Sequence, residues 1–379
     1  MNVVHGIAWY APESWGGTKQ YVSGLATSLA RIGARSSILA PGAGDAWREY
    51  EHQGVRVARH PAWRHAERRE LLAEWFRSSG ADVFHQHSWT PDAGLAELWA
   101  AKDSGLRTVL TVHIPAPVCA RGTMMLWGKR GCDGEILERR CSACWVHSHG
   151  APALASRAIA AIPAEASARM ARWLPHSRLQ HALRSRVEMR NRRAAIDRVD
   201  QSVDCVVAVS TWLRDALVLN GVSKERLVLS RQAIEPDWLD LLAAAKRQDH
   251  DGVRILCAGR WDPLKGQHVL VEAIRRVRGA KVRVRFAAPE PASGESADYR
   301  DRVLAMAAGD PRIELCKPAG RDWLAAEFAN ADLLAVPSQW FETGPLVVLE
   351  AKAAGLPVLG SALGGIAELV RPGVDGWLA

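Results

Sequence analysis

Short apolar segments alternate with amphipathic segments along most of this 379-residue chain, and this alternation restricts the fold more than any other feature. Strands that alternate with helices form parallel sheets covered by helices on both faces. Two such cycles are present, so the sequence predicts an α/β protein with two doubly wound domains. The predicted strands of the first cycle are 3–8, 37–40, 82–85, 108–113, 205–209 and 227–229, and those of the second are 254–258, 282–287, 313–316, 333–336 and 358–361.

Composition suggests where the two predicted domains meet. The polar stretch 243–252 (AAAKRQDHDG) is typical of a linker. We therefore expect an N-terminal domain at 1–240 and a C-terminal domain at 253–379, with a cysteine-bearing, Arg-rich insertion at 114–200 in the first. Because ligands of open α/β sheets bind at the carboxyl ends of the strands, we expect the two domains to face one cleft.

The charge balance indicates an anionic partner. The formal net charge is +8 and the sequence pI is about 9.3, which suits a phosphorylated small molecule, an anionic lipid or a nucleic acid. Residues 151–200 hold ten Arg against four acids and so carry +6 of this charge. These basic helices fit an anionic membrane surface, or equally a solvated basic face. Aromatic residues are not interleaved with them, so we expect no nucleic acid.

The N-terminus lacks the pattern of a signal peptide, and no apolar run is long enough for a transmembrane helix. We expect a cytoplasmic protein, peripheral at the inner face of the membrane if its basic helices bind lipid.

The segment FETGPLVVLEA, residues 341–351, places two carboxylates around the start of a predicted helix. Pro345 suits the first helical turn, and Thr343 or Gly344 can cap it. The free N–H groups of such a start favour phosphate, and Glu350 inside the helix can accept hydrogen bonds from a ribose diol. The alternative is that Glu342 and Glu350 are ordinary solvated charges.

A pair of cations follows the first strand of the second cycle, in AGRWDPLKGQ (258–267). Arg260 and Lys265 at this spacing can neutralise a diphosphate leaving group. The alternative is a solvated pair on a βα loop.

The first domain offers two further candidates. Gly16 and Gly17, before a predicted helix, let the backbone approach a ligand closely, although such a pair is often only a turn. His113 comes just past a strand end in TVHIP (111–115), where a lone histidine is often structural.

Residues 331–370 (ADLLAVPSQWFETGPLVVLEAKAAGLPVLGSALGGIAELV) resemble the signature of the retaining glycosyltransferases of family four, which have the GT-B fold. Residues 9–33 and 258–274 also resemble segments of that family. The Trp-x-Glu-x-x-Pro loop at 340–345 and the cysteine-bearing insertion resemble one bacterial branch.

This resemblance implies transfer of a sugar from a UDP-, GDP- or ADP-sugar to a hydroxyl group of a glycan or lipid-linked acceptor, with retention, in envelope glycan or exopolysaccharide synthesis. No cofactor or divalent metal is then needed for the chemistry. Implied catalytic residues are His113, Glu342, Arg260 and Lys265. Implied donor-binding residues are Gly16, Gly17, Arg260, Lys265, Glu342, Thr343, Gly344, Pro345, Leu346 and Glu350. The alternatives are another GT-B enzyme, such as a nucleotide-sugar epimerase or a phosphorylase, and a non-catalytic nucleotide-binding remnant.

The sequence departs from the family pattern in places. Ile114 follows His113 where a polar residue is usual, and 230–236 (SRQAIEP) replaces an Asn-Gly segment. Relatives continue beyond a segment like 373–379 for several helices, so we expect the second domain to be truncated.

Four cysteines in the insertion have the spacing C-x12-C-x8-C-x2-C. Four thiolates at such a spacing can enclose one tetrahedral structural zinc, and the alternative is reduced cysteines in a loop. The predicted ligands are Cys119, Cys132, Cys141 and Cys144.

Overall fold

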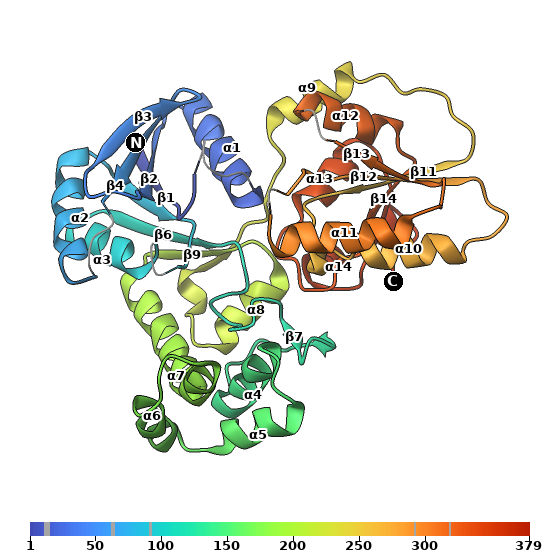
Figure 1. Cartoon of the computed structure of the whole chain (residues 1–379). Helices are drawn as coiled ribbons and strands as arrows, with labels where there is room; N and C mark the ends of the chain where they lie inside the picture. Colours follow the sequence, from blue (N-terminus) through green and yellow to red (C-terminus); the bar gives the residue numbers. More distant parts are fainter. Residues whose placement is uncertain (11–15, 62–64, 91–92, 292, 318–319) are drawn as a thin grey trace. The chain divides into compact units, whose positions relative to one another are not determined.

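The computed structural model describes residues 1–10, 16–61, 65–90, 93–291, 293–317 and 320–379. The chain divides into two compact units, Met1–Arg231 and Gln232–Ala379 (Figure 1). Each unit is built on its own mainly parallel sheet, which confirms the predicted α/β architecture of two Rossmann-like domains.

In the described part of the first unit, eight strands form one sheet in the order β10-β9-β6-β5-β1-β2-β4-β3. All neighbours are parallel except β3 and β4, which form a hairpin. Its strands are β1 (Asn2–Gly6), β2 (Arg35–Pro41), β3 (Arg48–His52), β4 (Val55–His60), β5 (Val83–Gln86), β6 (Arg107–Val112), β9 (Cys205–Ala208) and β10 (Leu227–Leu229).

The helices next to this sheet are α1 (Gly17–Arg31), α2 (His65–Ser79), α3 (Leu95–Asp103) and α8 (Thr211–Leu219), with the 3-10 turn η1 (Lys224–Arg226).

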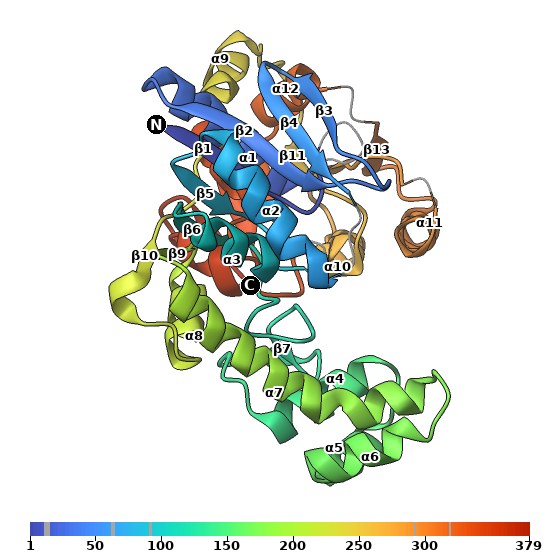
Figure 2. The same cartoon turned by 90° about the vertical axis from the view of Figure 1, so that its left-hand side faces the viewer.

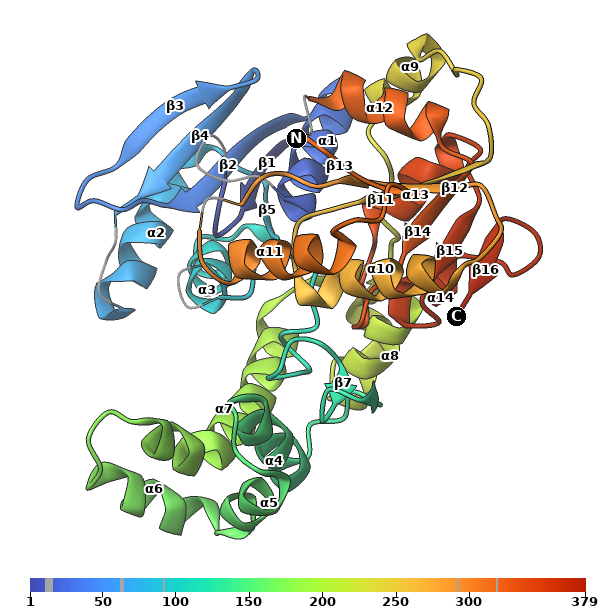
Figure 3. The same ribbon diagram turned by 45° about the vertical axis from the view of Figure 1, so that its right-hand side comes forward.

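Helices dominate the predicted insertion, which enters after β6 and returns at β9. The long helix α7 packs against both α4 and α6. In Figures 2 and 3, α5 and α6 lie at the end of this block that is remote from the strands of the first unit. Its elements are β7 (Met125–Leu126), β8 (Arg130–Gly131), α4 (Glu138–Ser148), α5 (Ala153–Ala161), α6 (Ala164–Arg172) and α7 (Arg178–Ser202). No helix in the described ranges is both long and apolar enough to cross a bilayer.

The described part of the second unit holds a six-stranded parallel sheet in the order β13-β12-β11-β14-β15-β16. Its strands are β11 (Val253–Ala258), β12 (Val282–Ala287), β13 (Ile313–Cys316), β14 (Leu333–Val336), β15 (Val358–Gly360) and β16 (Gly376–Leu378). Its helices are α9 (Pro236–Ala244), α10 (Gln267–Arg276), α11 (Glu295–Ala307), α12 (Arg321–Asn330), α13 (Leu346–Ala353) and α14 (Gly364–Leu369), with the 3-10 turn η2 (Pro263–Lys265). In α10, Leu270, Val271 and Ile274 recur at helical spacing and are buried, so the helix packs this apolar stripe onto the sheet.

The division between the units falls earlier than the sequence suggested. We expected the first domain to extend to residue 240, but α9 belongs to the second unit because Trp238 lies in its core, 1% exposed. The predicted linker is also bound there: the backbone N–H of Gln248 donates to Asn330 Oδ1 (2.7 Å) and Arg247 donates to Ala331 O (2.9 Å). A polar composition therefore marked an exposed surface segment of the second unit.

Candidate active site

The candidate donor site lies where the strand order of the second sheet reverses. β11 is followed along the chain by β12 and β13 on one side, whereas β14, β15 and β16 continue on the other side. The loops that leave the carboxyl ends of β11 and β14 therefore emerge next to each other, at the position where open α/β sheets bind ligands. The first loop carries Arg260 and Lys265, and the second carries Glu342.

Lys265 and Glu342 meet across this edge. Lys265 Nζ lies 2.6 Å from Glu342 Oε1, and the hydroxyl of Ser338 donates to the same oxygen at 2.8 Å. Glu342 is buried, whereas a quarter of the Lys265 side chain is exposed, and the indole ring of Trp340 has its centroid 5.9 Å from Lys265 Nζ. The two predicted residues, 77 positions apart, thus form one ion pair with a cation open to solvent.

Backbone contacts hold the two loops together. Gly266 has φ +71°, and a Cβ at this residue would lie 1.9 Å from the carbonyl oxygen of Pro337. Beside it, the backbone N–H of Gln339 donates to Leu264 O at 2.7 Å. Only glycine permits both this conformation and this approach. The position of Lys265 relative to Glu342 therefore depends on Gly266.

A second glycine pair supports the loop from the other side. The backbone N–H of Gly365 donates to Glu342 O at 2.6 Å. A Cβ at Gly364 or Gly365 would come within 2.8 Å or 2.6 Å of backbone oxygens of Glu342 and Thr343. The start of α14 thus fits directly under the residues that carry the site.

Arg260 is placed differently from Lys265. Its side chain is 66% exposed, and its guanidinium lies 3.0 Å from Asp262 Oδ2. Asp262 also accepts a hydrogen bond from the backbone N–H of Leu264, and Gln267 donates to Arg260 O. Arg260 is therefore an exposed cation whose guanidinium is held to Asp262.

The residues around the start of α13 correct one detail of the prediction. Pro345 is the N-cap residue and Leu346 the first helical one, and no side chain caps the helix. The predicted capping by Thr343 or Gly344 is wrong because the chain enters the helix one residue later. Glu350 is the fifth residue of α13 and is buried at 8% exposure.

In the first unit, His113 is one end of a chain of imidazoles. His113 Nε2 lies 3.1 Å from His87 Nδ1, and His87 Nε2 lies 3.2 Å from His5 Nδ1. His5 Nε2 then lies 3.3 Å from the hydroxyl of Ser36. The chain runs across the ends of β6, β5 and β1, with His5 and His85 in register on neighbouring strands.

Burial keeps these imidazoles neutral. Desolvation, aided by the nearby His85, lowers the pKa of His5 and of His113 to about 3. Burial also lowers the pKa of His85 to about 4 and that of His87 well below its ordinary value. A neutral imidazole has one donor and one acceptor nitrogen, so each ring in the chain donates on one side and accepts on the other.

Helix α1 connects the predicted glycine pair to this chain. The ring of Tyr21 packs edge-on against His113, with centroids 4.9 Å apart. Gly17 begins α1, and a Cβ on Gly16 would meet no described heavy atom within 4 Å. Residues 11–15, part of the segment that resembles the family's opening loop, lie outside the described residues.

In the described ranges, no three of the four cysteines of the insertion have their Sγ atoms within 4.8 Å of one another. Cys141 Sγ contacts Glu135 O at 3.6 Å, while Cys144 Sγ accepts a hydrogen bond from the backbone N–H of Trp127 at 3.2 Å. In the ranges that the structure describes, the one group of three or more possible ligands whose atoms all lie within 4.8 Å is His5, His85 and His87. Zinc binding by the cysteines stays a prediction.

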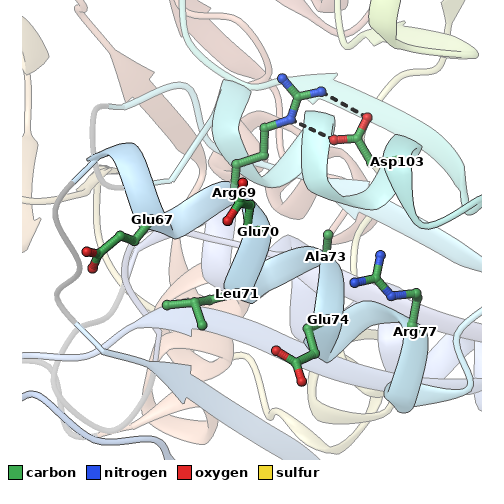
Figure 4. A pocket seen from close by; sticks show the side chains of 8 residues that line it. All are labelled: Glu67, Arg69, Glu70, Leu71, Ala73, Glu74, Arg77 and Asp103. Atoms are coloured by element: carbon green, nitrogen blue, oxygen red, sulfur yellow. Dashed lines mark hydrogen bonds and ion pairs between the residues drawn. The ribbon is translucent and has the colours of Figure 1, made fainter.

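A surface hollow of about 850 Å³ over α2 and α3 is a poor alternative site. Figure 4 shows charged side chains around it, with Arg69 paired to Asp103 at 2.6 Å. The two groups shift each other's pKa: the hydrogen bond to the Asp103 carboxylate raises the pKa of Arg69, and the Arg69 guanidinium lowers the pKa of Asp103. None of the residues predicted from the sequence lines it.

Solved structures share this fold over the whole chain. A glycosyltransferase from Rickettsia africae has a TM-score of 0.64 at 14% identity and covers 100% of this chain and 83% of its own. HepE from Anabaena, in complex with UDP, has a TM-score of 0.62 at 14% identity, covering 100% and 85%. Sucrose-phosphate synthase from Thermosynechococcus elongatus has 0.59 at 19% identity, also covering 100% and 85%.

Two family models match the two units. The model for glycosyl transferases group 1 matches residues 252–379, and the model for a glycosyl transferase 4-like domain matches residues 16–145. This chain belongs to the GT-B glycosyltransferases. The resemblance stated from the motifs is confirmed at the level of family and fold.

Curated relatives of this GT-B glycosyltransferase carry the name D-inositol 3-phosphate glycosyltransferase. The one from Stackebrandtia nassauensis is 30% identical over 235 residues, which are 55% of this chain and 52% of that protein. The one from Mycobacterium tuberculosis strain H37Ra is 29% identical over 181 residues, 43% of this chain and 37% of that protein. The matched part thus spans about half or less of these relatives.

Several residues of the site escaped the sequence analysis. Ser338 lies in the segment 331–370 that resembles the family signature but was not singled out, and neither were His5 and His87. The alternation of His85 and His87 in VFHQHS places both rings on one face of a strand end, which is a usable signal. His5 carries no such signal, because its neighbours in the sheet are decided by strand order.

Proposed function

We propose that this GT-B glycosyltransferase transfers a sugar from a nucleoside diphosphate sugar to a hydroxyl acceptor, with retention at the anomeric carbon. The ion pair between Lys265 and Glu342 carries the proposal. It provides a cation for the departing diphosphate and a carboxylate for sugar hydroxyls at one point of the sheet edge.

The chemistry follows from the charges that develop. Cleavage of the glycosyl–phosphate bond places negative charge on the diphosphate and positive charge on the sugar ring. Lys265 and the exposed Arg260 neutralise the first charge, as positioned cations do in phosphoryl chemistry. The start of α13 adds backbone N–H groups. Glu342 then exchanges its contact with Lys265 for sugar hydroxyls, and Glu350 takes the ribose.

His113 is proposed to act as a neutral hydrogen-bonding group in the reaction, as the family resemblance implies. Its lowered pKa prevents a second positive charge near the sugar, where positive charge is developing. No carboxylate is needed as a nucleophile, because the leaving phosphate takes the acceptor's proton. No divalent metal is required in this scheme, since two side-chain cations face the diphosphate.

A uridine donor is the first candidate. HepE has been solved with UDP-glucose, and starch synthase IV from Arabidopsis thaliana with ADP, so neighbours of this fold bind different bases. The acceptor is a glycan or lipid-linked hydroxyl, and the curated relatives direct attention to phosphorylated polyols as well. We place the reaction in envelope glycan or exopolysaccharide synthesis at the cytoplasmic face of the membrane.

Calorimetric titration of UDP, GDP and ADP with chelator present tests the donor site. We expect one nucleotide to bind the unmodified chain, and Lys265→Ala to weaken binding by roughly tenfold or more, because a charge-assisted contact to phosphate is lost. Arg260→Ala should also weaken it. The matched control is Lys281→Ala, which breaks an exposed pair with Asp251 of the same kind.

Equal affinity of Lys265→Ala and Lys281→Ala for the nucleotide would exclude the assigned site. If nucleotide binds but neither transfer nor donor hydrolysis is detected, the chain is a binding protein and the transferase proposal fails.

A further inference from the structure

The α6–α7 helical hairpin ends in an unusual surface. We call residues 169–184 the hairpin tip, which comprises the end of α6, the connection and the first turns of α7. In Figures 2 and 3 the two helices run side by side at the end of the insertion that is remote from the first sheet. Between Glu165 and Glu188 the sequence contains no acid.

The arginines of this hairpin fall into two groups. Arg186 and Arg190, nearer the middle of α7, pair with Glu138 at 3.1 Å each, and Arg190 also pairs with Glu165 at 2.7 Å. The side chains of the tip arginines form no hydrogen bond or ion pair with any residue in the described ranges, and all four residues are exposed. They are Arg169, Arg172, Arg178 and Arg184. Four like charges without a counter-charge repel one another, so an external anion would stabilise the tip.

Large apolar side chains stand among these charges. Trp173 is 89% exposed, Leu179 is 52% exposed and Met170 is 51% exposed. Trp173 is the C-cap residue of α6, so this highly exposed side chain belongs to the turn of the hairpin. Tryptophan beside leucine and arginine is the composition that favours the boundary between lipid headgroups and acyl chains.

A groove next to the tip adds a place for a phosphate group. It has a volume of about 430 Å³ between α6 and α7, and Arg169, Arg172 and Arg190 line it. Arg169 and Arg172 are two of the four unpaired arginines of the tip. Glu165 also lines the groove, but its carboxylate is already engaged by Arg190.

We propose that the hairpin tip docks this protein on an anionic phospholipid bilayer, with Trp173, Met170 and Leu179 at the headgroup boundary and the unpaired arginines on lipid phosphates. The tip presents positive charge and apolar side chains on one surface. A partner that satisfies both has an anionic surface above an apolar interior, as an anionic bilayer does. A nucleic acid would use the arginines and leave Leu179 and Met170 in water. The inference does not depend on glycosyl transfer, because it concerns a surface outside the donor site.

The test is flotation of the full chain with vesicles of phosphatidylcholine alone or with one-third phosphatidylglycerol, at about 0.1 M and about 0.5 M NaCl. We expect binding to the anionic vesicles that weakens at the higher salt. Arg169→Gln with Arg172→Gln should lower the partition coefficient about 30-fold. Trp173→Ala should lower it about tenfold. The matched control is Arg31→Gln with Arg198→Gln, two exposed arginines of the same unit outside the tip.

All of these side chains are exposed, so the variants should fold, and circular dichroism is the measurement that checks this. Three results would overturn the proposal: equal binding to neutral vesicles, unchanged binding of the tip variants, or an equal loss in the control pair. Binding of a short single-stranded RNA without any binding to vesicles would show that the tip recognises another polyanion, and this result would also refute the proposal. Nucleotide titration of the same samples is a separate measurement, so failure of the donor site and failure of the tip are distinguishable.

Discussion

Glu342 shares one oxygen between a lysine and a serine, and this arrangement predicts how its removal should act. Glu342→Gln keeps the shape but removes the charge that holds Lys265. We expect nucleotide affinity to stay the same or rise, because the ammonium group is released toward phosphate, while turnover falls about 100-fold from lost contacts to the sugar.

Paired nucleotide titration and turnover assays with a UDP-sugar measure the two effects separately. The control is Glu314→Gln, which changes a half-exposed carboxylate on β13 that pairs with Arg285 on β12. A variant at Glu342 that loses nucleotide binding and turnover in parallel would contradict the assigned role.

Gly266 predicts a stability effect that a second glycine isolates. Gly266 and Gly279 have nearly the same φ, +71° and +70°, but a Cβ at Gly279 meets nothing within 4 Å. Gly279→Ala should therefore cost only the backbone strain, about 1–2 kcal/mol. Gly266→Ala should cost about 3 kcal/mol or more, because the Pro337 carbonyl must also move. Chemical denaturation of both variants measures the difference, and equal losses would refute the close contact.

At the residue scale, the sequence predicted Lys265 and Glu342 as site residues but not the residues that support them. Both were identified because each lies in a motif that resembles the family. Their contact spans 77 positions, and Ser338, which donates to Glu342, was not singled out. His113 was found for the same reason, whereas His5 becomes meaningful only once β1 lies beside β5.

The histidines at the ends of β1, β5 and β6 predict that stability falls in mild acid. Their pKa values are lowered, to about 3 for His5 and His113 and about 4 for His85, whereas unfolded histidine titrates near 6.5. Below pH 6.5 the unfolded chain binds protons that the folded chain does not. The stabilisation is therefore complete above pH 6.5 and is lost as the pH falls toward 4, by about 1.4 kcal/mol per pH unit for each histidine.

His5→Gln tests this dependence. The free energy of unfolding, measured by urea denaturation between pH 7 and 5.5, should fall less steeply in the variant, by the share of one histidine. Above pH 7.5 the two slopes should agree, which serves as the internal control. Parallel curves throughout would show that His5 takes up a proton as readily in the folded protein as in the unfolded one.

At the element scale, the parallel strands were the easiest part to predict. The bounds of β10, β12, β13 and β14 agree with the expected ranges. β10 and β14 are apolar runs, whereas β12 (VRVRFA) alternates apolar residues with arginines, and β13 (IELC) has a single charged residue. The hairpin of β3 and β4 was missed. Its first strand, REYEH, is mostly charged and lies at the edge of the sheet, so no apolar pattern marks it. Its turn, at Gln53 and Gly54 with positive φ, was the available signal.

At the scale of the whole molecule, the division into units predicts which part a core substitution will affect. Trp238 on α9 is 1% exposed and packs on Phe328, whereas its neighbour Leu239 is 51% exposed. Trp238→Ala should destabilise the second unit by about 3–5 kcal/mol, and Leu239→Ala by well under 1 kcal/mol.

Hydrogen exchange read by mass spectrometry locates the loss. In Trp238→Ala, peptides from β14 and α13 should exchange faster, while those from β1 and β5 keep their protection. Loss of protection at β1 and β5 to the same degree would mean that α9 belongs to the first unit, as the sequence had suggested.

The way in which the Glu342 loop is held has a consequence for how such a site can change over generations. Its main anchors are main-chain atoms, from Gly365 N to Glu342 O and from Gln339 N to Leu264 O, fitted against three glycines. Hydrogen bonds between main-chain atoms do not depend on which side chains the loop carries. Substitutions at Gln339 and Trp340 can therefore accumulate without dismantling the loop, provided that the glycines stay. A library randomised at these two positions should keep most of its members folded, and under the proposed function these are the positions at which donor preference can evolve.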